Sequence, residues 1–137
     1  MKTFPTQRQT DSWGAGWFGA PRGSRTHHGI DLGAYPDMPI VNVIDGKVTK
    51  IGYPYDPNDV KKGHLRYIQI TDADGRDFRY FYVKPESGMV VGKAVKEGDI
   101  IGKAQGLDSI YNGITDHIHF EVKVDGEYVA PVAVLMS

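Results

Sequence analysis

Several short segments of the chain alternate between apolar and polar residues, and glycine or proline separates most of these segments. The clearest case runs from His117 to Val124, HIHFEVKV, where every second residue from Ile118 onward is apolar and would share one face of a strand. No long window repeats apolar residues with the helical period of about 3.6 residues. The pattern therefore predicts an all-β domain with little or no helix.

Two Asp-Gly pairs lie between apolar runs and suggest tight hairpin turns. The first, Asp45-Gly46, lies within residues 40–51, and the second, Asp74-Gly75, lies within residues 66–83. Such pairs suit hairpin turns because glycine readily adopts the positive φ angles that these turns require. We expect a single domain built on an antiparallel sheet, closed into a partial barrel or folded as a sandwich, with residues 52–64 as a surface loop.

Length and composition limit the possible functions. A chain of 137 residues suits one domain, so we expect 1–137 to form a single unit with 1–12 as an extended N-terminal segment. Sixteen Lys and Arg residues against seventeen Asp and Glu give a formal charge of -1, which argues against a nucleic-acid partner. The sequence contains no cysteine, so any bound metal must be held by histidine and carboxylate side chains.

The start of the chain, MKTFPTQRQT, lacks the apolar run of a secretory signal, and no later stretch is long and apolar enough to span a bilayer. We therefore expect a protein made in the cytoplasm, without membrane insertion. A monomer is the default expectation.

Four of the five histidines fall in two clusters, HHGID beginning at His27 and DHIH ending at His119. In an extended chain, His27 and Asp31 point the same way, and Gly29 would leave open space between them. His117 and His119 share the polar face of their predicted strand. Zinc accepts imidazole nitrogen and carboxylate oxygen, so two neighbouring strands could bring such ligands together. Either cluster alone could instead be a polar strand face or a solvated loop.

The order of the motifs resembles the lysostaphin and LytM type of zinc endopeptidase, which cuts peptide cross-links in bacterial cell walls. The resemblance is carried by RTHHGIDLGA, PIVNVIDGKVTKIG, VVGKAVKEGDIIGKA and DHIHFEV, in that order along the chain. It implies an all-β fold with a groove that holds one zinc ion per chain. By this resemblance His27, Asp31 and His119 bind zinc, and His117 acts on the attacking water or on the developing oxyanion.

One catalytic position departs from the family pattern. Members with demonstrated peptidase chemistry generally carry a histidine in a YxHL segment, and Tyr82 takes that position here. A tyrosine hydroxyl can donate to an oxyanion but is a poor base at neutral pH, so we expect Tyr82 to assist His117 in catalysis. The segment FYVKP is also similar to the leukocyte cell-derived chemotaxin-like branch, which has no established peptidase activity.

The expected partner is a peptidoglycan stem peptide or cross-bridge, and Tyr53, Tyr55 and Trp17 are candidates for contacting it. The resemblance fits a bacterial or phage protein that reaches the cell wall after release, or as part of a virion or envelope complex. Two alternatives stay open at this point. The domain could be a zinc-stabilised binding module that grips a glycopeptide or protein without cutting it, or a purely structural β domain that holds no metal.

Overall fold

The computed structural model describes residues 21–22, 25–26, 29–107 and 116–131, which form twelve strands. The strands are β1 Pro21–Arg22, β2 Arg25–Thr26, β3 Ile30–Gly33, β4 Pro39–Val41, β5 Gly46–Gly52, β6 Tyr67–Thr71, β7 Asp77–Phe81, β8 Val83–Pro85, β9 Ala94–Val95, β10 Ile100–Ala104, β11 His117–Val124 and β12 Glu127–Val129. All pairs between them are antiparallel, so the prediction of an all-β antiparallel fold is confirmed. Nowhere in these residues is there a helix long and apolar enough to cross a membrane.

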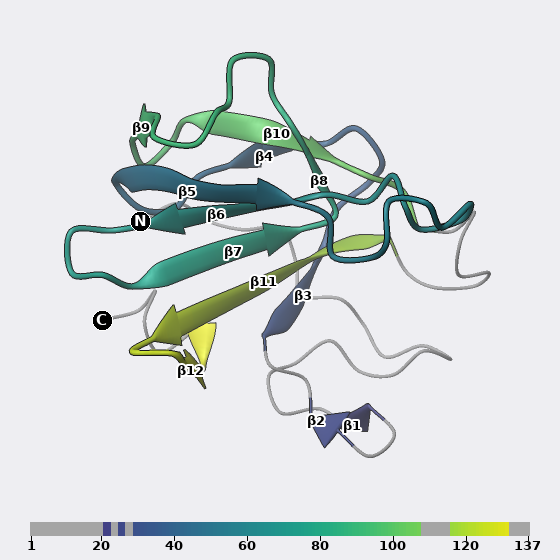
Figure 1. Ribbon diagram of the computed structural model, residues 1–137, viewed down its shortest axis with the longest axis horizontal. Helices are drawn as coiled ribbons and strands as arrows, with labels where there is room; N and C mark the ends of the chain where they lie inside the picture. Colours follow the sequence, from purple (N-terminus) through teal and green to yellow (C-terminus); the bar gives the residue numbers. More distant parts are fainter. Residues whose placement is uncertain (1–20, 23–24, 27–28, 108–115, 132–137) are drawn as a thin grey trace.

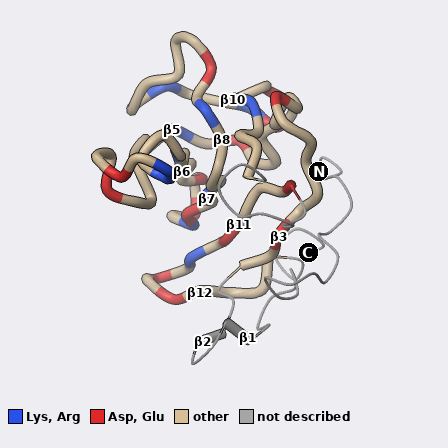
Figure 2. Tube along the Cα trace, turned by 90° about the vertical axis from the view of Figure 1, so that its right-hand side faces the viewer, with Lys and Arg blue, Asp and Glu red and all other residues tan. Residues whose placement is uncertain are grey.

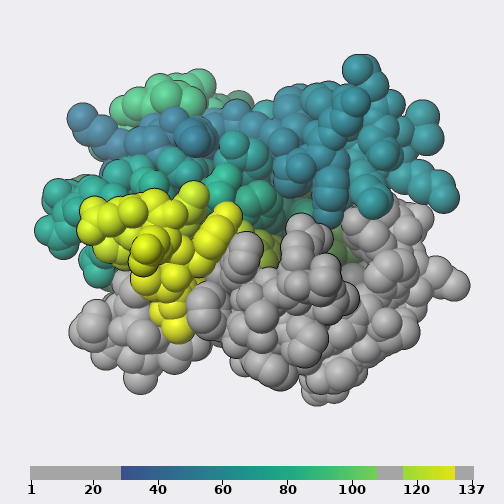
Figure 3. Space-filling model, turned by 60° about the horizontal axis from the view of Figure 1, so that its bottom comes forward, coloured from purple at the N-terminus to yellow at the C-terminus, as the bar shows by residue number. Residues whose placement is uncertain are grey.

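The strands form one large sheet and two smaller ones (Figure 1). The large sheet has the order β12-β11-β7-β6-β5-β9, and β3 pairs with β11 along the same edge as β12. A three-stranded sheet has the order β4-β10-β8, and β1 pairs with β2. In Figure 3 the yellow residues of β12 lie beside the teal residues of the large sheet.

One hydrophobic core joins the large sheet to the three-stranded sheet. Ile40 of β4 and Ile101 of β10 belong to the same buried cluster as Phe78 and Phe120 of the large sheet. On β11 the alternation predicted from the sequence is confirmed, because Ile118, Phe120 and Val122 are fully buried. The polar face of β11 is therefore directed away from this core.

The predicted hairpin at Asp45-Gly46 is wrong. β4 pairs with β10, whereas β5 pairs with β6 and β9. Asn42 directs the chain away from β5, because its backbone N–H donates to Asp99 and its side-chain amide donates to the Lys96 carbonyl. Gly46 lies within β5, where a Cβ atom would collide with the Thr71 carbonyl oxygen, so close strand approach explains this glycine.

The second predicted hairpin is confirmed, with one change at its end. β6 pairs with β7, and Gly75 takes the positive φ of 80° that the turn requires. The predicted strand ran to Val83, but β7 stops two residues earlier, at Phe81, because Tyr82 adopts a left-handed φ of 69°. This turn moves the chain out of the large sheet and into β8 of the three-stranded sheet.

Charged residues of both signs are interspersed over the described trace (Figure 2), in agreement with the nearly balanced composition. The segment between β5 and β6 is a largely exposed loop, as expected for residues 52–64. It ends close to the end of β7, because Tyr67, the first residue of β6, is the direct cross-strand partner of Phe81, the last residue of β7.

Candidate metal centre

Strand register brings together two chemically reactive residues that lie far apart in the sequence. β3 and β11 pair so that Asp31 lies directly opposite His119. On the other side of β11, Phe81 of β7 is the cross-strand partner of His119, and Tyr67 is the partner of Phe81. A single row across four strands therefore runs Tyr67, Phe81, His119, Asp31.

Three polar side chains converge at the Asp31 end of this row. His119 Nδ1 lies 3.0 Å from Asp31 Oδ1, and His117 Nε2 lies 3.5 Å from Asp31 Oδ2. The side chains are almost withdrawn from solvent, with 3% of Asp31, 4% of His117 and 15% of His119 exposed. Because water screens little at such depth, charge interactions among these groups are strong.

Burial alone would lower the pKa of His119, but its two carboxylate neighbours have the larger combined effect. Hydrogen bonds to Asp31 and Glu121, together with their negative charges, raise the pKa of His119 above its usual value. In the metal-free protein, His119 is thereby favoured in the charged form, with both ring nitrogens facing carboxylate oxygens.

Glu121 is a site residue that the sequence reasoning did not identify. Its Oε1 lies 2.8 Å from His119 Nε2, and its Oε2 accepts a hydrogen bond of 3.0 Å from Arg79 Nη1. Glu121 is only 5% exposed. The signal was present in the strand period, since Glu121 follows His119 by two residues and shares its face.

Tyr82 lies beside His117. Their rings meet edge to face, with centroids 5.8 Å apart and planes at 85°. The Tyr82 hydroxyl lies 3.3 Å from the Tyr55 hydroxyl, and both rings pack against the buried Leu65 and Leu107. The structure therefore places Tyr82 next to His117 and Tyr55 next to Tyr82.

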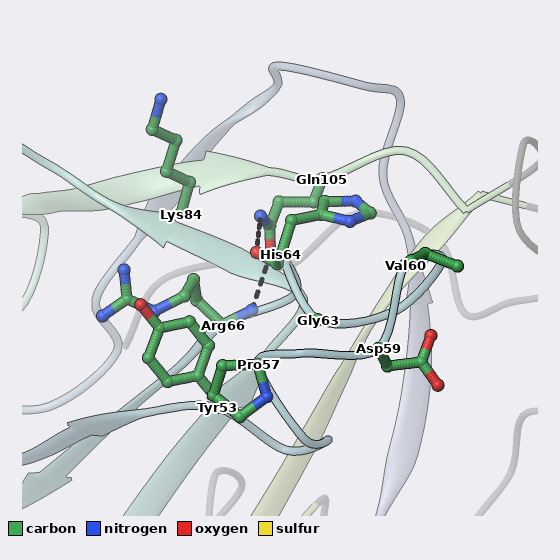
Figure 4. Close-up of a pocket in the computed structure, with 9 residues that line it drawn as sticks. All are labelled: Tyr53, Pro57, Asp59, Val60, Gly63, His64, Arg66, Lys84 and Gln105. Atoms are coloured by element: carbon green, nitrogen blue, oxygen red, sulfur yellow. Dashed lines mark hydrogen bonds between the residues drawn. The ribbon is translucent and has the colours of Figure 1, made fainter.

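The remaining predicted residues are His27, Trp17 and Tyr53. His27 and Trp17 lie outside the described residues. Tyr53 lines a separate surface cavity of about 610 Å³, where its ring stacks on the Arg66 guanidinium at 4.3 Å (Figure 4). The lining of that cavity includes His64 but none of the residues around Asp31.

The side chains of Asp31 and His119 suit zinc as a pair. Two ligands bound about 2.0 Å from one tetrahedral ion lie about 3.3 Å apart, close to the 3.0 Å between Asp31 Oδ1 and His119 Nδ1. Within the described ranges, no group of three or more His, Cys, Asp or Glu side chains forms a complete metal-binding set. The third expected ligand, His27, lies outside those ranges.

Gly29 has a different role from the one predicted. A Cβ atom at Gly29 would collide with the Phe120 carbonyl oxygen and press on the Cβ of Glu121. Because Gly29 has no side chain, the chain that enters β3 can approach the backbone of β11 closely. The expectation that Gly29 leaves open space between two metal ligands is therefore wrong.

Comparison with known proteins identifies the family. Residues 25–131 match the family model described as Peptidase family M23. Mouse (Mus musculus) leukocyte cell-derived chemotaxin-2 is 31% identical over 117 residues, a match that spans 83% of this chain and 71% of that protein.

Solved structures agree in fold. The catalytic domain of the antimicrobial peptidase lysostaphin from Staphylococcus simulans superposes with a TM-score of 0.68 at 23% identity, covering 90% of this chain and 91% of that one. A zinc containing peptidase from Vibrio cholerae superposes with a TM-score of 0.61 at 25% identity, covering 92% of this chain and 37% of that one. The lysostaphin-type fold expected from the motifs is confirmed, and the chain belongs to peptidase family M23.

Proposed function

We propose that the protein is a zinc endopeptidase that hydrolyses amide bonds in the stem peptides or cross-bridges of bacterial peptidoglycan. The observation that carries this proposal is the convergence of His119 Nδ1, Asp31 and His117 Nε2 in a site that is almost completely buried from solvent. Membership of a peptidase family and the likeness to lysostaphin support it. The proposed zinc ligands are His27, Asp31 and His119, with one zinc ion per chain.

Each residue of the site would have a distinct task. When bound, zinc lowers the pKa of water toward neutrality and polarises the scissile carbonyl. Asp31 supplies one negative charge at the metal, and His119 supplies a neutral imidazole nitrogen. His117, which faces Asp31 through Nε2, would take a proton from the attacking water or donate one to the developing oxyanion.

Tyr82 would assist at the position where active relatives carry a histidine. Its ring meets the ring of His117 edge to face, and its hydroxyl lies within hydrogen-bond distance of the Tyr55 hydroxyl. A hydroxyl held beside the reacting carbonyl can donate a hydrogen bond to the oxyanion, and such donors are worth about 3 kcal/mol in the transition state. The Tyr55 hydroxyl would fix the direction in which this donor points.

A second candidate function is a zinc-stabilised binding module that does not cut its ligand. Two observations favour it. Tyr82 is a much weaker base than histidine, and a relative at 31% identity bears the name of a chemotaxin. On this alternative the same ligands hold zinc for stability, and His117 has no chemical task.

The proposed place of action is the bacterial cell wall, which the protein would reach after release from a cell or as part of a virion or envelope complex. We further propose that it acts as a monomer. Each site would then be complete within one chain.

A His117→Ala variant separates the two candidate functions, because His117 is not a proposed zinc ligand. The experiment measures zinc content by elemental analysis and digestion of purified sacculi by the loss of turbidity, for the wild type and the variant. The endopeptidase predicts that the variant keeps one zinc ion and loses digestion. Digestion at the wild-type rate by zinc-loaded His117→Ala would contradict the catalytic role of His117.

A further inference from the structure

We infer that Glu121, held in place by Arg79, is a positioning residue that orients the imidazole of His119 toward the metal. This inference rests on the proposed function, because it assigns Glu121 a task only if His119 binds zinc. It concerns a residue pair outside the expected ligand set of His27, Asp31 and His119.

The contact between Glu121 and His119 fixes which ring nitrogen is available. His119 Nε2 lies 2.8 Å from Glu121 Oε1, so a proton on Nε2 is donated to that carboxylate. The other nitrogen, Nδ1, is then directed toward Asp31 Oδ1 at 3.0 Å. A metal ligand with this arrangement has one nitrogen for the ion and a carboxylate on the other, which fixes the ring and raises its basicity.

Arg79 in turn holds Glu121. The Arg79 guanidinium donates to Glu121 Oε2 at 3.0 Å and lies over the rings of Tyr67 and Phe81, at 5.3 and 5.1 Å from their centroids. Only 16% of the Arg79 side chain and 7% of the Glu121 side chain is exposed, so solvent competes little for the pair.

Strand register fixes the position of Arg79 relative to Glu121. Arg79 of β7 is the direct cross-strand partner of Glu121 on β11. This pair lies two positions along the strands from the pair of Phe81 and His119, and therefore on the same face of the sheet. Phe81 also meets the His119 ring edge to face, with centroids 5.4 Å apart. The imidazole is thus held by a hydrogen bond at Nε2 and by an aromatic ring at its side, which limits rotation of the ring.

The test is a zinc titration against a chromophoric chelator, carried out on the wild type and on three variants. Glu121→Ala removes the acceptor, and Glu121→Gln keeps an oxygen acceptor of the same length while removing the charge. Glu127→Gln is the matched control, because Glu127 is an exposed glutamate on the neighbouring strand β12. Circular dichroism with chelator present shows whether each variant is folded before zinc is added.

We expect Glu121→Ala to weaken zinc binding by about 10- to 100-fold, the usual effect of removing such a partner of a metal-bound histidine. Glu121→Gln should recover part of the loss, and Glu127→Gln should bind within about twofold of the wild type. If Glu121→Ala does not fold, the zinc affinities of Glu121→Gln and Glu127→Gln are compared instead. Glu121→Gln is then expected to bind zinc at least about threefold more weakly than Glu127→Gln. A folded Glu121 variant that binds zinc as tightly as the wild type would overturn the inference.

A second readout reports on the imidazole itself. Nitrogen NMR of the zinc-loaded protein gives the protonation of each His119 ring nitrogen. The inference requires a proton on Nε2 in the wild type, with a resonance that shifts in Glu121→Gln. An unprotonated Nε2 in the wild type would also overturn it. A wild type that binds no zinc would instead refute the proposed function, so the two failures are distinguishable.

Discussion

The rings of Tyr82 and His117 meet edge to face, with their planes at 85°, and the Tyr82 backbone lies in the left-handed region at a φ of 69°. Non-glycine residues in this region are uncommon and are held there by their surroundings, here the packing against Leu65 and Leu107. The conformation turns the chain from β7 into β8 and fixes Tyr82 at the site.

Replacing Tyr82 by Phe tests the hydroxyl without removing the ring. If the hydroxyl donates to the oxyanion, kcat for peptide cleavage should fall by about 100-fold, while zinc content and KM change little. Steady-state kinetics on a soluble wall-peptide substrate measure this. An unchanged kcat would show that Tyr82 serves packing alone.

Replacing Gly29 by Ala should destabilise the protein, because the added Cβ collides with the backbone of Phe120 and forces β3 away from β11. Overpacking of this kind costs about 1 to 3 kcal/mol in the free energy of unfolding. Urea unfolding measures the loss. Gly75→Ala is an informative comparison, because open space surrounds Gly75 and its cost arises only from the positive φ. Wild-type stability of Gly29→Ala would contradict the close approach described here.

The ion pair between Arg79 and Glu121 should be worth more than a surface pair. Arg79→Met leaves the buried Glu121 carboxylate without its arginine donor, and loss of one partner of a buried pair costs about 3 kcal/mol. A double-mutant cycle with Glu121→Gln, measured by urea unfolding in chelator, isolates the coupling between the two residues. A coupling energy near zero would show that the two residues do not stabilise the fold through each other.

The raised pKa of His119 predicts the pH dependence of the metal-free protein. Because the folded-state pKa lies above the unfolded value of 6.5, the stabilisation is fully present below about pH 6.5 and is lost as pH rises through the folded-state pKa. Urea unfolding in chelator at a series of pH values should show this decline, and His119→Gln should reduce it. A decline of the same size in His119→Gln would assign it to another group.

Zinc binding should strengthen as pH rises, whereas the stability of the metal-free protein falls. A metal ligand must lose its proton on the coordinating nitrogen, so the apparent zinc affinity should rise with pH over the range in which His119 titrates. Titration of zinc at several pH values measures this, and a pH-independent affinity would contradict a ligand role for His119.

The strands with strict alternation were predictable from the sequence, and those held by distant contacts were not. The bounds of β11 follow from HIHFEVKV alone, since one apolar face must enter the core. The prediction of the first hairpin was wrong because Asn42 donates hydrogen bonds to the backbone carbonyls of Lys96 and Asp99, far along the chain. These contacts override the turn signal of Asp45-Gly46.

The same limit applies to the site. His117 and His119 are visible in the sequence because they share one strand face. The partnership of Arg79 with Glu121 joins residues 42 positions apart and depends on which strand lies beside β11, which the sequence pattern does not specify. Glu121 itself could have been predicted as a site residue, because it continues the two-residue spacing of His117 and His119 along one strand face.

The most direct test of the account is mass spectrometry of fragments released from purified sacculi by zinc-loaded protein, beside a sample treated with chelator. A zinc endopeptidase should release fragments with new peptide ends that form only with zinc and that identify the bond cut. Intact wall peptides after incubation with protein confirmed to hold one zinc ion would contradict the peptidase and favour the binding module.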